Sequence, residues 1–214
     1  MKRAAIGVRM HSGWGAMVAV SSEADRVNVL QRRRIVAFST GARGGKQPYH
    51  FAKGLEPEEA EKFLRECFEA SRSLALTAVQ ELRDELSGRY RLVGSAVLLA
   101  SGRPLPSLSK ILASHSLIHA AEGEFYREVF SKACECLELA VTGFRERDLG
   151  QHVEATFGVA ANRVSQQVSD AGRLLGPPWT QDQKMAALAA LVVLANEQKP
   201  SAVRTENGPL APVE

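Results

Sequence analysis

Three side chains in the middle of the chain could together ligate a metal ion. His115, His119 and Glu122 recur at i, i+4 and i+7, so a helix through them carries all three on one face. Imidazole pairs at this spacing bind zinc and other transition metals, with a carboxylate as a third ligand. The alternative is a pair of hydrogen-bonded histidines at the boundary of a helix that also presents an apolar surface. Because no closing ligand is identifiable in the sequence, we expect no tight zinc binding by these three residues.

A second cluster combines a cation with an aromatic ring near the amino terminus. Arg9, His11 and Trp14 follow one another closely in the chain. An arginine beside an aromatic side chain can hold a phosphate or a stacked nucleobase. The alternative is an arginine paired with an acid and a tryptophan in the core. We keep Arg9 and His11 as candidate nucleic-acid contacts.

Positive charge gathers in one short region, although the whole chain carries a formal net charge of only +3. The residues are Arg32, Arg33, Arg34, Arg43 and Lys46. The last two belong to a glycine-rich loop over residues 39–48, in which backbone N–H groups could approach an anion. The loop fails the P-loop pattern because Gln47 stands where a serine or threonine is needed, and a mobile solvated loop is the alternative. We predict weak, sequence-independent contact with DNA or RNA through Arg32, Arg34, Arg43 and Lys46.

Composition is that of an ordinary globular protein, with 214 residues, 45% of them hydrophobic and 24% charged. The three cysteines form no recognisable disulfide or metal framework, which is typical of a reducing cytosol. The most apolar run, residues 185–195, is too short to span a bilayer. The amino-terminal residues contain no long apolar segment before polar residues, so no signal peptide is expected there. We therefore expect a cytoplasmic protein that makes no membrane contact.

The elements that must position these residues follow an α/β pattern. Strand-forming runs cover residues 4–10, 14–20, 27–38, 90–100 and 140–144. Helical spacing covers residues 55–85, 107–122, 124–139, 148–157, 160–175 and 180–196. The second and third of these helices are either separated at Gly123 or joined in one bent helix. Three strands in a meander, followed by right-handed crossovers, predict a mixed five-stranded sheet with helices on both faces.

The domain organisation follows from where the periodicity stops. Residues 1–197 are interpreted as a single domain. Residues 198–214 contain prolines and polar residues without any period, so they are predicted to form a disordered C-terminal tail.

Three stretches of the chain carry a resemblance to a known family. They are residues 6–20 (IGVRMHSGWGAMVAV), residues 93–100, and a C-terminal part with Val141-Thr142-Gly143, Pro177-Pro178 and the alanine-rich run 181–194. Together they resemble the ribonuclease H-like superfamily, and within it the RuvC-type Holliday-junction resolvases. The resemblance implies a site at the strand ends where carboxylates hold two magnesium ions. The middle domain of peptide-chain release factors shares the same element order, and no motif separates the two.

Most of the acids that this resemblance implies are missing. The first-strand aspartate would fall at Arg9, the strand over 93–100 contains no acid, and Met185 takes the place of the last aspartate. Asp182 matches the remaining ligand, and its alternative explanation is an acid in the first turn of a helix. A guanidinium at the centre would repel the metals. We expect no cofactor, with magnesium bound only if a site is rebuilt from other residues.

Three functional interpretations remain open on the sequence alone. The first is a catalytically degenerate ribonuclease H-like domain that binds DNA or RNA or serves as a scaffold. Under this interpretation the protein is not an enzyme. The second is a metal-dependent phosphodiester hydrolase rebuilt around the histidine pair. The third is a protein-interaction module, or a homodimer, that binds no nucleic acid.

Overall fold

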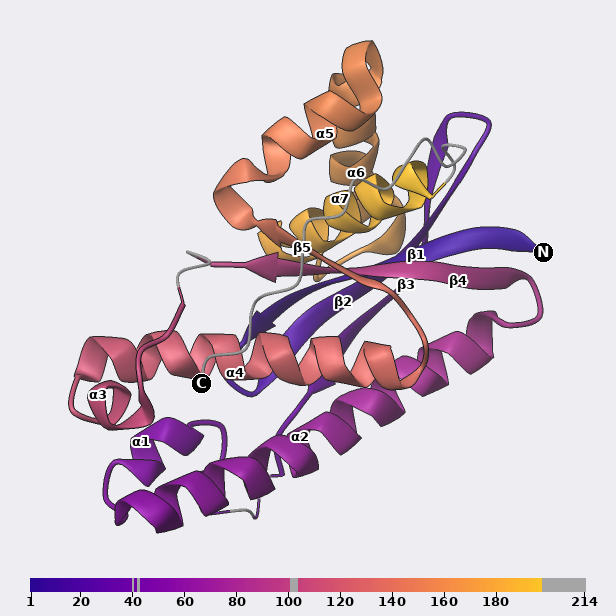
Figure 1. The fold of residues 1–214 in the computed structure, drawn as a ribbon. Helices are drawn as coiled ribbons and strands as arrows, with labels where there is room; N and C mark the ends of the chain where they lie inside the picture. The colour runs from indigo at the N-terminus through magenta and orange to yellow at the C-terminus, as the bar shows by residue number, and fades with distance from the viewer. Residues whose placement is uncertain (40, 42, 101–103, 198–214) are drawn as a thin grey trace.

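One mixed sheet forms the middle layer of the molecule (Figure 1). The computed structural model describes residues 1–39, 41, 43–100 and 104–197. The strands are β1 (Lys2–His11), β2 (Trp14–Glu23), β3 (Arg26–Val36), β4 (Tyr90–Leu99) and β5 (Val141–Arg145), in the order β3-β2-β1-β4-β5. The first three pair antiparallel, whereas β4 runs parallel to both β1 and β5. The predicted five-stranded sheet with a leading meander is confirmed.

Position in the sheet explains the composition of the first three strands. β1 is central, and its residues Ala4–Val8 are all buried, as expected of a strand covered on both faces. β3 is an edge strand, and its residues are mostly half-buried. An edge strand can carry charged side chains, which also discourage pairing with another chain. The three consecutive arginines of β3 are therefore compatible with a strand.

Helices cover both faces of the sheet. They are α1 (Pro48–Ala52), α2 (Pro57–Leu86), α3 (Leu108–Leu112), α4 (His115–Cys136), α5 (Leu149–Phe157), α6 (Ala161–Leu175) and α7 (Gln181–Asn196), with short 3-10 turns η1 (Glu146–Asp148) and η2 (Gly158–Ala160). α2 and α4 enclose one apolar core with the sheet, and α5, α6 and α7 enclose the other (Figure 1). Within the described segments, no helix is long and apolar enough to cross a membrane.

α7 lies directly against β1. A Cβ atom on Gly7 would stand 2.0 Å from the carbonyl oxygen of Ala186, so the helix and the strand touch backbone to backbone. The helix begins with a capping box, in which the Thr180 hydroxyl accepts from the Asp182 N–H and the Gln183 side chain accepts from the Thr180 N–H. Close packing and a fixed first turn together place Asp182 at the end of β1.

The helical stretches predicted over 107–122 and 124–139 have other boundaries in the structure, which shows the continuous alternative at Gly123. α4 continues through Gly123, and the chain interrupts the helical pattern earlier, at Ala113 and Ser114, between α3 and α4. Gly123 leaves room for Arg127, whose Nη1 would lie 3.1 Å from a Cβ there. Arg127 uses that space to donate from Nε to the Leu98 carbonyl at 3.1 Å.

A short helix that was not predicted follows the glycine-rich loop. Residues 48–52 form α1, with Pro48 in its first turn, where a missing N–H costs nothing. The sequence contained this signal, but five residues are too few to show a helical period. The predicted tail over residues 198–214 lies outside the described residues.

Candidate functional site

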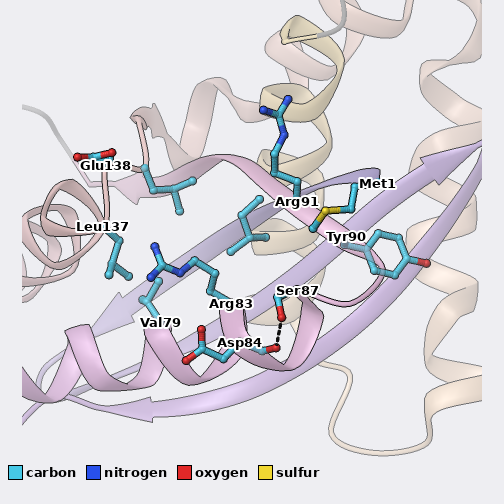
Figure 2. Close-up of a pocket in the computed structure, with 11 residues that line it drawn as sticks. Met1, Val79, Arg83, Asp84, Ser87, Tyr90, Arg91, Leu137 and Glu138 are labelled. Carbon is cyan, nitrogen blue, oxygen red and sulfur yellow. Dashed lines mark hydrogen bonds between the residues drawn. The ribbon is translucent and has the colours of Figure 1, made fainter.

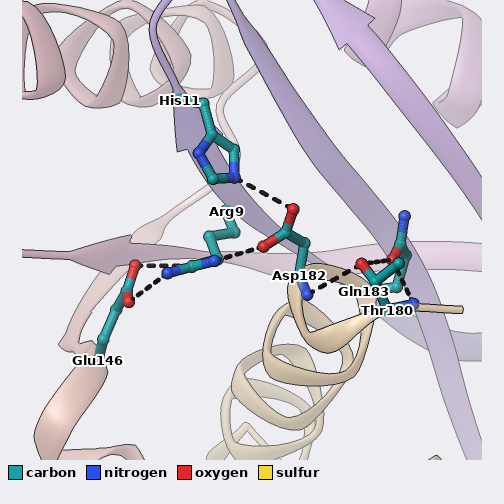
Figure 3. Close-up of polar contacts among 6 residues, drawn as sticks. All are labelled: Arg9, His11, Glu146, Thr180, Asp182 and Gln183. Carbon is teal, nitrogen blue, oxygen red and sulfur yellow. Dashed lines mark hydrogen bonds and ion pairs between the residues drawn. The ribbon is translucent and has the colours of Figure 1, made fainter.

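Arg9 is the centre of a polar cluster at the carboxyl ends of the parallel strands (Figure 3). Its Nε donates to Oε1 of Glu146 at 2.9 Å, and its Nη2 donates to Oε2 of the same carboxylate at 2.7 Å. Its Nη1 donates to Oδ1 of Asp182. Such a two-pronged contact is the strongest geometry of an arginine–carboxylate pair. The Arg9 guanidinium therefore pairs with both carboxylates at once.

The fold explains why residues 9, 146 and 182 meet. β1, β4 and β5 run in the same direction, so their last residues lie together at the edge of the sheet formed by the carboxyl ends of these strands. Sites of α/β proteins lie at this edge. Glu146 follows β5 in η1, and Asp182 belongs to the first turn of α7. The hydrogen bond to Glu146, together with that to Asp182, raises the pKa of Arg9 above its ordinary value, so Arg9 is charged at every physiological pH.

This cluster is poorly suited to hold two divalent cations. Arg9 contributes one positive charge against the two carboxylates, which leaves a net charge of only −1 before His11 is counted. The end of β4 adds Leu98 and Leu99 and no acid. Magnesium needs oxygen ligands, and a two-metal site needs several carboxylates free of other partners. Arg9 would have to leave before a metal ion could enter.

Sequence reasoning found Asp182 but missed Glu146. The signal was available, because Glu146 comes directly after the predicted last strand, and the end of that strand lies at the same sheet edge as the end of β1. Glu146 was not selected because the family resemblance implies no acid after the last strand. The resemblance-based alignment of Asp182 beside the end of β1 agrees with the observed contact to Arg9.

A column of side chains continues from this cluster toward solvent. His11 Nε2 lies 3.1 Å from Oδ2 of Asp182, and the His11 ring stacks on Trp14 with centroids 4.4 Å apart and an interplanar angle of 15°. The guanidinium carbon of Arg34 lies 4.2 Å from the centroid of the Trp14 ring. Trp14 is half-buried, whereas Arg34 is exposed. Trp14 therefore orients an exposed cation at the end of the column.

The other candidate cations divide into anchored and exposed ones. Arg32 donates to the carbonyl oxygens of residues 175–178, including Leu175 at 2.8 Å and Gly176 at 2.7 Å, so it fastens β3 to the segment before α7. Arg43 and Lys46 are exposed, and the guanidinium of Arg43 lies 5.1 Å from the centroid of the Phe51 ring.

Lys46 is brought next to the β1–β2 turn. A Cβ atom on Gly13 would stand 2.6 Å from the Cβ of Lys46, so the glycine-rich loop touches that turn. Gly13 also has φ +80°, a conformation that favours glycine. The loop therefore places Lys46 at the same edge of the sheet as His11 and Trp14.

The structure brings together two of the three residues that were weighed as a metal group. His115 and His119 do come together, with their Nε2 atoms 3.1 Å apart. Glu122 is buried instead, with 1% side-chain exposure, and its Oε1 accepts from the N–H groups of Tyr49 and His50. His50, a residue that sequence reasoning did not select, takes the third position beside the two histidines.

A cavity of about 330 Å³ lies at the other end of the sheet (Figure 2). It is lined by the last turns of α2, the start of β4 and residues 137–139. Tyr90 in its wall pairs with Lys2 at the start of β1, seven residues before Arg9. At about 3.3 Å per strand residue, the cavity is roughly 20 Å from the Arg9 cluster, so it is not part of that site.

Comparison with known proteins supports the fold. No family model and no curated protein sequence matches the chain. Among solved structures, Thermus thermophilus RuvC is similar, with 12% sequence identity, a TM-score of 0.52, and coverage of 91% of this chain and 95% of that one. The same protein in complex with a Holliday junction substrate matches at a TM-score of 0.49 and 12% identity, covering 92% of this chain and 95% of that one. This chain has the ribonuclease H-like, RuvC-like fold that the sequence predicted.

Proposed function

We propose that this protein is a ribonuclease H-like domain that binds nucleic acid without cleaving it. One observation carries the proposal: at the sheet edge where the resemblance implies magnesium-binding acids, a guanidinium holds both carboxylates and an arginine–aromatic column continues to the surface. The chemistry of this edge suits a polyanion and does not suit a pair of metal ions.

The non-catalytic part of the proposal rests on Arg9. Nuclease chemistry of this fold class needs metal ions that activate water and stabilise the leaving oxygen. Arg9 supplies one fixed positive charge and cannot act as a base that takes a proton from water, because its raised pKa keeps the guanidinium protonated. Three of its five N–H groups already donate to the two carboxylates. The edge therefore lacks a free set of carboxylates for two metal ions, and Arg9 supplies no general base.

The binding part rests on the exposed cations around the column. Arg34, Arg43 and Lys46 are exposed, and Arg34 presents a guanidinium oriented by Trp14. Arginine planes stack on unpaired bases and bind phosphates, which favours single-stranded or distorted nucleic acid. Arg32 drops out of this group, because its donors are engaged by backbone carbonyls. Sequence-independent contact by three cations predicts modest affinity.

The test is a titration of a fluorescein-labelled single-stranded DNA at several salt concentrations. Three phosphate contacts predict a slope of about −2 for log affinity against log salt, from roughly −0.7 per contact. The combined Arg34→Gln, Arg43→Gln and Lys46→Gln variant should lose roughly tenfold or more in affinity at low salt. Intrinsic fluorescence of Trp14 should change on binding, and Trp179→Phe should retain that change.

A charge-matched variant controls for net charge. Lys62→Gln, Arg65→Gln and Arg173→Gln remove the same three charges from side chains that are 74%, 71% and 81% exposed, two on α2 and one on α6. This control variant should bind the labelled DNA with the affinity of the unmodified protein. Equal loss in both triple variants, or no salt-dependent binding at all, would contradict the proposal and favour a protein-interaction module.

A further inference from the structure

Three histidines from two separate segments meet beside α1 and the start of α4. Among the residues that the structure describes, His50, His115 and His119 are the one set of potential metal ligands whose atoms all lie within 4.8 Å of one another. The rings stand edge to face, with centroids 4.5 Å apart for His115 and His119 and 4.8 Å apart for His50 and His119. His50 precedes His115 by 65 residues, so only the fold brings them together.

Glu122 fixes the orientation and the tautomer of His50. Its Oε1 lies 3.2 Å from Nδ1 of His50 and also accepts from the backbone N–H groups of Tyr49 and His50, at 2.9 and 3.1 Å. A carboxylate accepts hydrogen bonds, so Nδ1 of His50 carries the proton and Nε2 keeps its lone pair. A carboxylate on the far nitrogen is the usual partner of a metal-bound histidine.

The distance between two of the three imidazoles suits a tetrahedral ion, and the ligand atoms of all three histidines lie within 4.8 Å of one another. Two nitrogens that bind zinc at about 2.0–2.1 Å stand about 3.3 Å apart in tetrahedral geometry. The Nε2 atoms of His115 and His119 are 3.1 Å apart, close to that value. Both residues are exposed, so a fourth coordination position faces solvent.

The buried carboxylate points to a cation as well. Glu122 has 1% side-chain exposure, and its Oε2 has no hydrogen-bond partner among the described residues. Buried charges are normally paired or close to a metal ion. A metal ion on His50 would place positive charge one imidazole away from this carboxylate and offset its burial.

We propose that His50, His115 and His119 form a binding site for zinc or another imidazole-preferring transition metal, with Glu122 as the positioning residue of His50. Imidazole donors select such ions over magnesium and calcium, which prefer oxygen. The bound ion joins α1, a helix of five residues, to the start of α4. Three protein ligands leave one position for water. The site is separate from the Arg9 cluster, so it stands or falls independently of nucleic-acid binding.

The direct test is metal titration of the untagged, metal-stripped protein. Zinc should bind with one-to-one stoichiometry, and cobalt(II) should give the intense visible absorption of a tetrahedral nitrogen-ligated ion. Exposed ligands can be removed without disturbing the core, so His115→Ala and His119→Ala should fold normally and lose both signals. Glu122→Gln should weaken zinc affinity about 10–100-fold, the usual effect of losing a carboxylate behind a ligand.

His152→Ala is the matched control, because His152 is an exposed histidine on α5, packed against Phe144 and outside the cluster. It should bind zinc like the unmodified protein. Binding that survives both His115→Ala and His119→Ala, or a cobalt spectrum without tetrahedral bands, would overturn the assignment. Cys136→Ser, which removes the exposed thiol, should leave the cobalt spectrum unchanged, and a spectrum that depends on Cys136 would also overturn it.

Discussion

Arg9 holds Glu146 through two parallel hydrogen bonds, with Nε and Nη2 each donating to a different oxygen of the same carboxylate. The contact joins the end of β1 to the turn that follows β5, across 137 residues of sequence. Asp182, on the third nitrogen, brings in α7. Arg9 thus joins three elements, the end of β1, the turn after β5 and the start of α7, through ion pairs with two carboxylates.

Replacing Arg9 should therefore reduce stability. Arg9→Gln leaves two carboxylates close together without their cation, and hydrogen bonds to charged groups contribute about 1.5–3 kcal/mol each when well shielded. Because the side chains are 18–30% exposed, we expect the free energy of unfolding to fall by about 1–3 kcal/mol in total. Urea unfolding measures it.

Arg147→Gln is the control for that experiment. The Arg147 side chain is 71% exposed, and its one ion pair among the described residues is with its neighbour Asp148, at 3.3 Å. Such a surface pair contributes about 0–1 kcal/mol. Equal urea midpoints for Arg9→Gln and Arg147→Gln would show that the Arg9 cluster does not hold the three elements together.

The contact between α7 and β1 gives a second stability prediction. Gly7→Ala would place a methyl group 2.0 Å from the Ala186 carbonyl oxygen, so the helix must move away from the central strand. Overpacking of this kind costs about 1–3 kcal/mol, and more where backbone is the obstacle. Thermal unfolding should show a clearly lower midpoint.

A second glycine provides the opposite expectation. Gly150 lies exposed in α5, and a Cβ there would meet nothing within 4 Å. Gly150→Ala should stabilise the protein by about 0.5–1 kcal/mol, because alanine loses less conformational entropy in a helix. A destabilised Gly150→Ala protein, or a Gly7→Ala protein as stable as the original, would be inconsistent with this packing.

The sequence predicted the sheet well because its strands carry strong local signals. β1 and β4 are apolar runs between clear turns, and Thr180 marks the start of α7. The sequence left open whether the helix breaks at Gly123, since glycine lowers helix propensity, and in the fold Arg127 fills the space that this glycine leaves. Propensity describes the local chain and contains no information about that tertiary contact.

The candidate sites depended on contacts between distant segments, which limited what the sequence could predict. Arg9 and Asp182 could be placed together only through the family resemblance, which assigned no role to Glu146. His50 carries no local sign of its position, because its neighbours in space, His115 and His119, follow it by more than 60 residues. Glu122 satisfied the helical spacing of a ligand, yet burial against α1 turned it toward His50.

Thiol reactivity tests the core beneath α4. Cys134 is fully buried, and burial raises its pKa to about 12 from an ordinary 9.0, whereas Cys136 is exposed. A thiol reagent at pH 8 should label Cys136 quickly and Cys134 only after unfolding. Since the native pKa is the higher one, the stability contributed by Cys134 is complete below pH 9 and is lost as the pH rises toward 12.

Cys134→Ala should not show this loss of stability at alkaline pH. The difference in unfolding free energy between the unmodified protein and Cys134→Ala should therefore shrink between pH 9 and pH 11. A constant difference over this range, or labelling of Cys134 as fast as Cys136, would mean that the thiol is accessible in the native state.

Binding and cleavage measured on one sample test most directly whether this protein binds nucleic acid without cleaving it. A labelled four-way junction is incubated with the protein in magnesium or manganese, then divided between a native gel, which reports binding, and a denaturing gel, which reports cleavage. We expect a salt-sensitive complex and intact strands. The Arg9→Asp protein should also leave the strands intact, because that change alone supplies too few acids for two metal ions. Metal-dependent cleavage that Asp182→Asn abolishes would contradict this expectation.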